Sequence, residues 1–588
     1  MILTLGLLSI AQVCFIPGAI IYRLLIGRSS IQESLPVSFA LSLVFNWVVV
    51  FYSAKFGFFN LHTLCLILVI EFFIGFLFFI KDNNVAVVNY PTINNETNFN
   101  IRTYSFIVLA LTLIVVLPKV GHVFIESDAV LSWNRWATIW ATNVIPVDTY
   151  HYPQLLPANY AISYVLTGNS TLQVFSYAEC LFFFPLACLA FFNLAETIGD
   201  NRVHLANIIF FIFITLSGNI TNGYADTPVA CMTVISICIF IFGWRETNQN
   251  PQKGLRLILL SALVAAGAAA TKQAGIFYAL INVIGVMVWL RTFSYASKAN
   301  RLFLMVCTIL INIVIAVCWY VQAQHNINLG LNTSEIDYVT NSIYKGQPYM
   351  ARFTQALLHR PSYFILAIIS LPALKLKGYK WATISGIVFL IIWALFFSYD
   401  TRNFALGIPL LAIGAGASCV SLAKWLPKIK VNPHFIVLTR PINKLVFAVL
   451  PIIVFSSLIP DHLLIQLQNL EQEKVGIEQY NKALYRAFEK YGEGSVISND
   501  GLMPYASHMP KNILFYYDFY DHSIHNELLF IELLSEPSLR YIIVAPKVLS
   551  PNLKSLLHKM QNDKKIILIE NIKMKHNNFH SIYLKNGK

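Results

Sequence analysis

Apolar runs of about 20 residues recur along most of this 588-residue chain, and they constrain its fold more than any other feature. Each run is long enough to cross a bilayer core of roughly 30 Å as a helix. Charged residues make up 12% of the chain, which is about half of what a soluble protein carries. The sequence therefore predicts a polytopic α-helical membrane protein.

The positions of these runs predict about fourteen membrane-spanning helices. By residue number the expected spans are 2–24, 36–54, 61–80, 104–120, 171–195, 205–220, 226–243, 256–271, 274–290, 301–321, 361–376, 379–398, 402–422 and 443–459.

The composition changes after the last expected span. There the short β-type runs "SVISND", "RYIIVAP" and "KKIILIE" alternate with helix-type stretches, which is typical of a small α/β domain. We therefore expect three N-terminal spans and a cytoplasmic loop over 1–103, a main helical domain over 104–459, and an α/β domain over 460–588.

Lysine and arginine are distributed unequally between the loops. Most of the loop cations lie in five segments on one side of the expected topology, "YRLLIGRSS", "WRETNQNPQKGLR", "RTFSYASKANR", "LKLKGYK" and "KWLPKIKVNPHFIVLTRPINK". The positive-inside rule assigns that side to the cytoplasm. We thus expect a multi-pass protein of the inner (plasma) membrane, with both termini, the α/β domain and the loops 121–170 and 322–360 outside. We find no basic stripe interleaved with exposed aromatics, so nucleic acid is not an expected partner.

The long outward loop 121–170 opens with "FIESDAVLSWNRWATIWATN". Long structured loops on a helical bundle often line a functional cavity. Asp128 follows an expected span closely, where partial desolvation suits a carboxylate to act as a general base. Glu126 is either a second acid or a solvated neighbour, and a helix-capping role for Asp128 is the plainer alternative. Arg135, His151 and Tyr152 lie in the same loop.

Three tryptophans follow these carboxylates at positions 133, 136 and 140. Their spacing places the indoles on one face of a short helix. Such a stripe is typical of a helix that lies in the membrane interface, so we expect it to hold the preceding carboxylate at the aqueous side.

Short outward turns carry further charges. "NGYADTP" contains Tyr224 and Asp226, "AATKQAG" contains Lys272, and "SYDTRN" contains Asp400 and Arg402. Cations in short outward turns go against the positive-inside bias, so a compensating group is expected. One candidate is an anionic ligand such as a phosphate or pyrophosphate, which an arginine fork and a lysine point charge can bind. The alternatives are ion pairs with the neighbouring aspartates and contacts with the phosphates of membrane lipids.

Taken together, these motifs resemble the GT-C superfamily of polyprenyl-phosphate-sugar-dependent glycosyltransferases. The resemblance rests on an early outward loop with an acidic residue, on the following helix with Trp and Arg, and on "YHYPQLLPANYAISYVLTGNS" before the next span. The turns "YADTP" and "TKQAG" are similar to later turns of that family, and the resemblance covers roughly residues 105–420. By pattern, the protein O-mannosyltransferases and the lipid A aminoarabinose transferases are nearest.

The resemblance implies an enzyme that takes a sugar from a polyprenyl-phosphate carrier on the outer face and passes it, with inversion, to a glycan, lipid or protein acceptor. By position, Asp128 would deprotonate the acceptor. Lys272 and Arg402 would hold the carrier phosphate and stabilise its charge as it leaves.

Further roles follow from the same resemblance. His151 and Tyr152 would line the cavity with Arg135 and Tyr224, and Asp226 would orient a cation or the sugar. Many relatives carry adjacent Asp and Glu at the catalytic position, whereas Ser127 separates the two carboxylates here. This difference leaves open which of Glu126 and Asp128 is the base and whether a divalent metal ion takes part.

Two other classes of membrane protein are alternatives. A transporter or lipid flippase would show internal repeats and charged or broken helices near the bilayer centre, whereas we find no repeat and expect the polar residues at one membrane face. An O-antigen ligase or polymerase, which uses lipid-pyrophosphate donors, would carry arginine and histidine in a late outward loop. His325, Arg352 and His359 lie in such a loop, so this alternative stays open.

Overall fold

The computed structural model divides into two compact units, which are described separately. The helical unit comprises Met1–Phe124 and Ser132–Val437, and the second unit comprises Ile125–Leu131 and Leu438–Lys588. The structure describes residues 2–27, 29–82, 99–124, 126, 128–147, 149, 151–170, 172–218, 220–292, 298–329, 347–376, 378–425, 483, 486–492, 494–498, 513–516, 531, 534–535, 537, 539–544, 551–573 and 579–586.

The described part of the first unit is built from α-helices. Their bounds are α1 (Ile2–Cys14), α2 (Ile16–Ile26), α3 (Ile31–Lys55), α4 (Leu61–Asp82), α5 (Phe99–Val116), α6 (Arg135–Ala141), α7 (Leu155–Thr167), α8 (Gln173–Cys180), α9 (Phe183–Ile198), α10 (Asn201–Leu216), α11 (Asp226–Glu246), α12 (Pro251–Thr271), α13 (Ala274–Thr292), α14 (Lys298–Asn312), α15 (Cys318–Asn328), α17 (Tyr349–His359), α18 (Pro361–Ser370), α19 (Lys380–Ile392) and α20 (Gly407–Trp425).

Tighter or wider helical turns interrupt or extend several of these helices. They are the 3₁₀ turns η1 (Leu117–Lys119), η5 (Leu371–Lys375) and η7 (Thr401–Phe404), and the π-helical turns η2 (Ala129–Asn134), η3 (Ile313–Val317) and η6 (Trp393–Phe397).

Helices of membrane-spanning length dominate this unit. Among the described residues, ten helices are long and apolar enough to cross a membrane, or up to 11 if the bent pair Tyr349–His359 and Pro361–Lys375 forms one span. Asn201–Leu216 and Gly407–Leu422 are shorter apolar helices. Each expected span up to residue 422 coincides with a helix, which confirms the polytopic α-helical class, while the expected span 443–459 lies outside the described residues.

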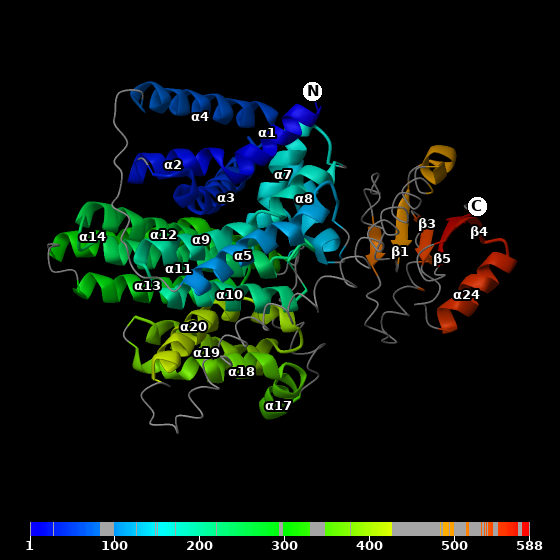
Figure 1. Cartoon of the computed structure of the whole chain (residues 1–588). Helices are drawn as coiled ribbons and strands as arrows, with labels where there is room; N and C mark the ends of the chain where they lie inside the picture. The colour runs from blue at the N-terminus through cyan, green and yellow to red at the C-terminus, as the bar shows by residue number, and fades with distance from the viewer. Residues whose placement is uncertain are drawn as a thin grey trace. The chain divides into compact units, whose positions relative to one another are not determined.

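The helices form layers within this unit. In Figure 1, α1–α4 lie at the top of the helical unit, α9–α14 in the middle and α17–α20 at the bottom. The central helices α11 and α12 are buried over most of their length, whereas α4 and α13 present exposed large side chains such as Phe72, Phe73, Leu280 and Ile284. An apolar exposed face on a long helix is what contact with lipid requires.

Two glycines allow helices to approach closely. A Cβ at Gly18 of α2 would lie 1.8 Å from the Ser38 carbonyl oxygen of α3, and the Gly18 amide donates to Ser42 Oγ at 2.9 Å. A Cβ at Gly275 would lie 2.0 Å from the Ala268 carbonyl oxygen. Small residues at such crossings let backbones pack directly, and the second crossing brings the start of α13 against the end of α12.

A buried polar seam runs along one face of α1. Ser9 Oγ lies 2.8 Å from Ser163 Oγ, which donates to Glu179 Oε1 at 2.9 Å. One turn further, Gln12 Nε2 donates to Glu71 Oε1 at 3.2 Å. Polar groups within apolar spans are costly unless they are paired. The carboxyl groups of Glu71 and Glu179 therefore lie between the packed helices. The sequence suggested that polar residues gather at one membrane face, whereas these two lie within apolar spans.

The second unit contains a five-stranded sheet in the order β2-β1-β3-β5-β4. Its elements are β1 (Ser495–Ser498), β2 (Ile513–Tyr516), β3 (Leu539–Val544), α24 (Pro551–Asn562), β4 (Ile566–Lys573) and β5 (Phe579–Lys585). β1 pairs in parallel with β2 and β3, whereas β3 and β4 pair antiparallel with β5.

Alternate residues of β3 pack on opposite faces of this sheet. Tyr541 and Ile543 join a cluster with Phe488 on one face, and Ile542 joins a cluster with Leu553 of α24 on the other. A sheet that is buried on both faces is typical of α/β domains, which confirms the fold class expected for the C-terminal part. The three-way division at 103 and 459 stays a prediction.

Candidate functional site

Lys272 joins two of the turns that carry unexpected charges. It caps the C-terminal end of α12, and its ammonium donates to the Asp226 carboxylate at the first residue of α11 and to Asn403 Oδ1 at 2.9 Å. A carboxylate suits a helix N-terminus and a cation suits a C-terminus, so both helix ends favour this pair. The Lys272 and Asp226 side chains are 11% and 6% exposed.

A second ion pair lies in the turn between η6 and α20. Asp400 is the N-cap of η7, and its carboxylate accepts from the Arg402 backbone amide at 2.9 Å and from Arg402 Nε at 2.7 Å. Arg402 Nη2 lies 2.5 Å from the same carboxylate. Trp393 Nε1 donates to the Asp400 carbonyl oxygen at 3.1 Å, so the turn is fixed from both sides.

Arg402 also connects this turn to the third one. Its guanidinium carbon lies 4.4 Å from the centroid of the Tyr224 ring, which is a cation–π contact. The three charged turns found in the sequence therefore meet at one end of the helical unit. Both cations are held by the neighbouring aspartates, which is one of the compensations that the sequence left open.

A third cation borders the cluster. Arg360, which is exposed, donates from Nη2 to Thr401 Oγ1 at 3.4 Å. Arg352, eight positions before Arg360, is buried and donates from Nε to the Gln347 carbonyl at 3.0 Å. With Lys272 and Arg402, Arg360 brings three cations to two carboxylates, so among the residues that the structure describes the cluster carries a net positive charge. Such a cluster can bind an anionic oxygen-rich group.

The charge of this cluster predicts a pH dependence. Burial by itself would raise the pKa of the Asp400 carboxyl, but the hydrogen bonds and charge of Arg402, with the charge of Lys272, hold that pKa below its usual value. A group with a depressed pKa adds stability above its unfolded pKa of about 4 and loses it as the pH falls through the folded value.

Wild-type protein should therefore lose more thermal stability than Asp400→Asn when the pH falls from 6 to 3.5. Unfolding temperatures in detergent at both pH values measure this loss, and Asp563→Asn, at an exposed carboxylate, should behave as wild type. Equal losses for wild type and Asp400→Asn would contradict the assigned pKa shift.

The tryptophans of the first long outward loop are buried. Trp133, Trp136 and Trp140 are 4%, 2% and 0% exposed. The Trp140 ring packs 6.2 Å from Trp47 and 6.2 Å from Trp319. The predicted interfacial stripe is therefore wrong, because all three indoles are buried within the protein, Trp140 against aromatic residues of α3 and α15.

This aromatic packing also positions two predicted cavity residues. The Tyr152 ring lies 5.6 Å from Trp133 and 6.1 Å from Trp136. His151 Nε2 lies 3.3 Å from Gln324 Oε1, so the loop is tied to α15. Arg135 begins α6 and is half-buried. These residues group around the loop, and their role as a substrate lining stays a prediction.

The predicted catalytic carboxylates belong to the second compact unit. Glu126 and Asp128 are both exposed, and the Glu126 carbonyl oxygen accepts from the Val130 amide at 3.0 Å. Their association with Lys272 and Arg402 stays a prediction. Within the described residues, no group of three or more His, Cys, Asp and Glu side chains is placed to hold a metal ion.

Three members of the cluster were missed from the sequence. Asn403 follows Arg402 directly, so the polar run of "SYDTRN" was a usable signal for it. Thr401 lies in the same run, whereas Arg360 gave no signal, because its hydrogen bond to Thr401 joins residues 41 positions apart.

No family model and no curated protein matches the chain. Among solved structures, it is similar to a crystal structure of ArnT from Cupriavidus metallidurans bound to undecaprenyl phosphate, with 13% identity and a TM-score of 0.49, over 83% of this chain and 98% of that one. It is also similar to the archaeal oligosaccharyltransferase AglB from Archaeoglobus fulgidus in complex with an inhibitory peptide and a dolichol-phosphate, with 12% identity and a TM-score of 0.41, over 76% of this chain and 70% of that one. Identities and TM-scores this low do not show what the chain does, so its function is inferred from its own residues.

Proposed function

We propose that this chain is an integral membrane glycosyltransferase that moves a sugar from a polyprenyl-phosphate carrier to a glycan, lipid or protein acceptor. The observation that carries the proposal is the net positive cluster of Lys272, Arg402 and Arg360 at one end of membrane-spanning helices. A lipid-linked phosphate combines an apolar tail with an anionic head, so a cationic site at the end of apolar helices suits it.

The ion pairs would prepare Lys272 and Arg402 for the carrier phosphate. Asp226 and Asp400 hold the two cations in place. Negative charge grows on the carrier phosphate as its bond to the sugar breaks. Cations that are already oriented stabilise that charge without a reorganisation cost.

Transfer would then proceed by a single displacement. The acceptor oxygen attacks the anomeric carbon, the bond between that carbon and the carrier phosphate oxygen breaks, and the configuration inverts. The base takes the acceptor proton, and the carrier leaves as its phosphate. We assign the base to Asp128, with Glu126 as the alternative, on the sequence resemblance to the GT-C enzymes.

Arg402→Lys tests the proposed phosphate contact. The variant keeps the charge but loses the planar fork and the stacking on Tyr224. We expect purified protein in nanodiscs to bind undecaprenyl phosphate about tenfold more weakly, measured by native mass spectrometry against geranylgeraniol, which lacks the phosphate. Arg291→Lys, at the far end of α13 from Lys272, is the matched control. Equal binding by both variants would remove Arg402 from the site.

An O-antigen ligase or polymerase is a second candidate, favoured by the contact of Arg360 with Thr401 beside the second ion pair. A third cation suits the larger charge of a pyrophosphate. The carrier released on transfer distinguishes the two enzymes. Undecaprenyl phosphate among the reaction products supports the glycosyltransferase, and undecaprenyl diphosphate supports the ligase or polymerase.

The proposed site requires the charged turns and the C-terminal unit to lie outside the cytoplasm, at the plasma membrane. We expect Asp563→Cys, at an exposed position, to react with a membrane-impermeant thiol reagent in intact spheroplasts. Asn248→Cys, in the turn between α11 and α12, should react only after lysis. Wild-type protein gives the background from its nine cysteines. The reverse pattern of labelling would overturn the orientation.

A further inference from the structure

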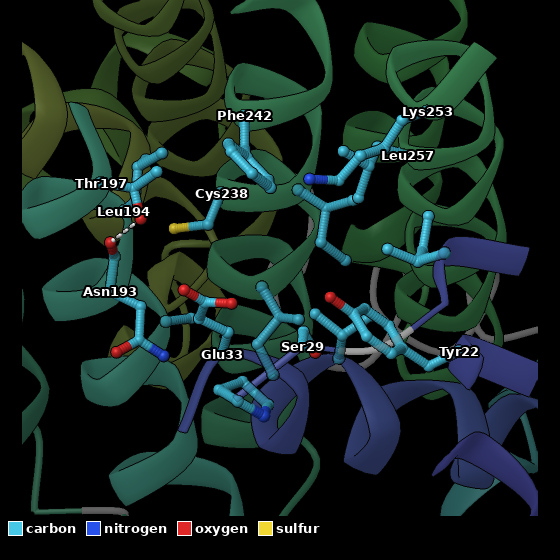
Figure 2. Close-up of a pocket in the computed structure, with 16 residues that line it drawn as sticks. Tyr22, Ser29, Glu33, Asn193, Leu194, Thr197, Cys238, Phe242, Lys253 and Leu257 are labelled. Atoms are coloured by element: carbon cyan, nitrogen blue, oxygen red, sulfur yellow. Dashed lines mark hydrogen bonds between the residues drawn. The ribbon is translucent and has the colours of Figure 1, made fainter. Parts of the chain in front are cut away.

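An open pocket lies between the helix ends remote from the charged cluster. Its empty volume, with its open mouth included, is about 720 Å³. Helices α2, α3, α9, α11 and α12 form its walls (Figure 2). The lining residues are Tyr22, Ile26, Ser29, Glu33, Pro36, Val37, Ala190, Asn193, Leu194, Thr197, Ile235, Cys238, Ile239, Phe242, Lys253 and Leu257.

The pocket is separate from the cluster that carries the proposed function. Asp226 begins α11, and Phe242 lines the pocket near the other end of that helix. Sixteen residues of helix correspond to about 24 Å. A ligand in the pocket therefore occupies the opposite end of the bundle.

Two opposite charges stand among the apolar lining. Lys253 is half-buried, pairs with Glu246 at 3.2 Å, and lies 5.4 Å from the Phe242 ring centroid. Glu33 is exposed in the first turn of α3, and among the described residues none forms an ion pair with its carboxylate. Figure 2 shows the ends of both side chains directed toward the space between the helices. An ammonium carries three donors, so Lys253 can contact Glu246 and a further oxygen together.

Hydrogen-bonding groups accompany these charges. Asn193 joins α9 to the start of α3, donating from Nδ2 to the Gln32 carbonyl at 2.7 Å and accepting from Gln32 Nε2 at 3.1 Å. The pair keeps the α3 end, and hence Glu33, at a fixed place beside the pocket. The rest of the lining is mostly aliphatic and aromatic, as an acyl chain requires.

We propose that this pocket binds one membrane phospholipid with a zwitterionic, primary-amine headgroup, that is, phosphatidylethanolamine chemistry. One acyl chain occupies the apolar space, the phosphate contacts Lys253, and the lipid ammonium contacts Glu33. The charges of Lys253 and Glu33 favour this lipid over others. An anionic headgroup without an amine brings the same phosphate charge but no cation to pair with Glu33. A choline group has no N–H to donate to a carboxylate.

Native mass spectrometry of the purified full-length protein tests this assignment. Phosphatidylethanolamine, phosphatidylcholine and phosphatidylglycerol of equal chain length are titrated separately, and the first bound lipid is counted. We expect phosphatidylethanolamine to bind about two- to fivefold more tightly than either other lipid, which is the effect of a partly exposed ion pair.

Variants assign that preference to the two charges. Glu33→Gln should remove the preference for phosphatidylethanolamine over phosphatidylcholine. Lys253→Gln should weaken the binding of all three lipids. Lys55→Gln, at the other end of α3, should bind each lipid as the wild type does. Size-exclusion profiles confirm that each variant is folded. Equal binding of the three lipids by wild type, a preference for phosphatidylglycerol, or an unchanged preference in folded Glu33→Gln would overturn the proposal. None of these outcomes bears on the transfer reaction, since the site lies at the opposite helix ends.

Discussion

Replacing Asp128 with asparagine is expected to lower the rate of sugar transfer about 10²- to 10⁴-fold, the usual contribution of a general base. An asparagine amide has nearly the shape of the carboxylate but cannot accept the acceptor proton. Because Asp128 is exposed, the substitution should leave the fold intact. The measurement is the initial rate at which hexose or amino-sugar masses appear on envelope lipids, glycans and proteins, compared by mass spectrometry at equal protein levels.

Glu126→Gln is the matched control for this experiment. It lies in the same segment and is also exposed, so any effect of lost charge alone should appear in both variants. A full rate in Asp128→Asn together with a lost rate in Glu126→Gln would move the base to Glu126. Wild-type rates in both would withdraw the assignment of a carboxylate base to this segment.

Replacing Lys272 with methionine should destabilise the helical unit by about 3–5 kcal/mol, because it leaves a buried carboxylate without its partner. Asp226 is 4% exposed and begins α11, so water cannot take the place of the ammonium. Thermal or denaturant unfolding in detergent, followed by loss of the buried tryptophan signal, measures the change.

The double variant Lys272→Met with Asp226→Asn separates stability from function. Removing both charges should restore most of the lost stability, whereas binding of undecaprenyl phosphate should stay weak because the cation is absent. A double variant that is stable and also binds the carrier as wild type would mean that the pair is structural only. A single variant as stable as wild type would contradict the burial of the pair.

The charged cluster could be predicted in part from the sequence. The topology and the positive-inside bias singled out the turns of Lys272 and Arg402 without any knowledge of contacts, because a cation in a short outward turn is unusual. Whether an aspartate or a ligand compensates each cation depends on distances across the fold. Asp226 and Lys272 are 46 positions apart, at adjoining ends of the consecutive helices α11 and α12. The short turn between these helices predicts that they are antiparallel neighbours, but it does not predict which side chains pair at their ends.

The tryptophan stripe shows a different limit. Trp136 and Trp140 lie in α6 and Trp133 in the preceding π-helical turn η2, and their spacing suits an interfacial belt as well as a packed core. Trp140 is part of a packed core because Trp47 and Trp319 pack against it, and both belong to helices distant in the sequence. In the C-terminal unit, β1, β3 and β4 followed from apolar runs, whereas β2, "ILFY", and β5, "FHSIYLK", were both missed. Polar residues interrupt the run of β5.

The polar seam of α1 sets a condition on biogenesis. Ser9 reaches its partner Ser163 across 154 positions, and a ribosome adds them in roughly 10–30 s. Before α7 is made, Ser9 Oγ can donate within its own helix to the Gly6 carbonyl, at 2.7 Å, and Gln12 has partners in Asn46 of α3 and Glu71 of α4. The Ser9–Ser163–Glu179 contacts, which fix α1 against α7 and α8, are therefore among the last that α1 can form during synthesis of the helices it touches.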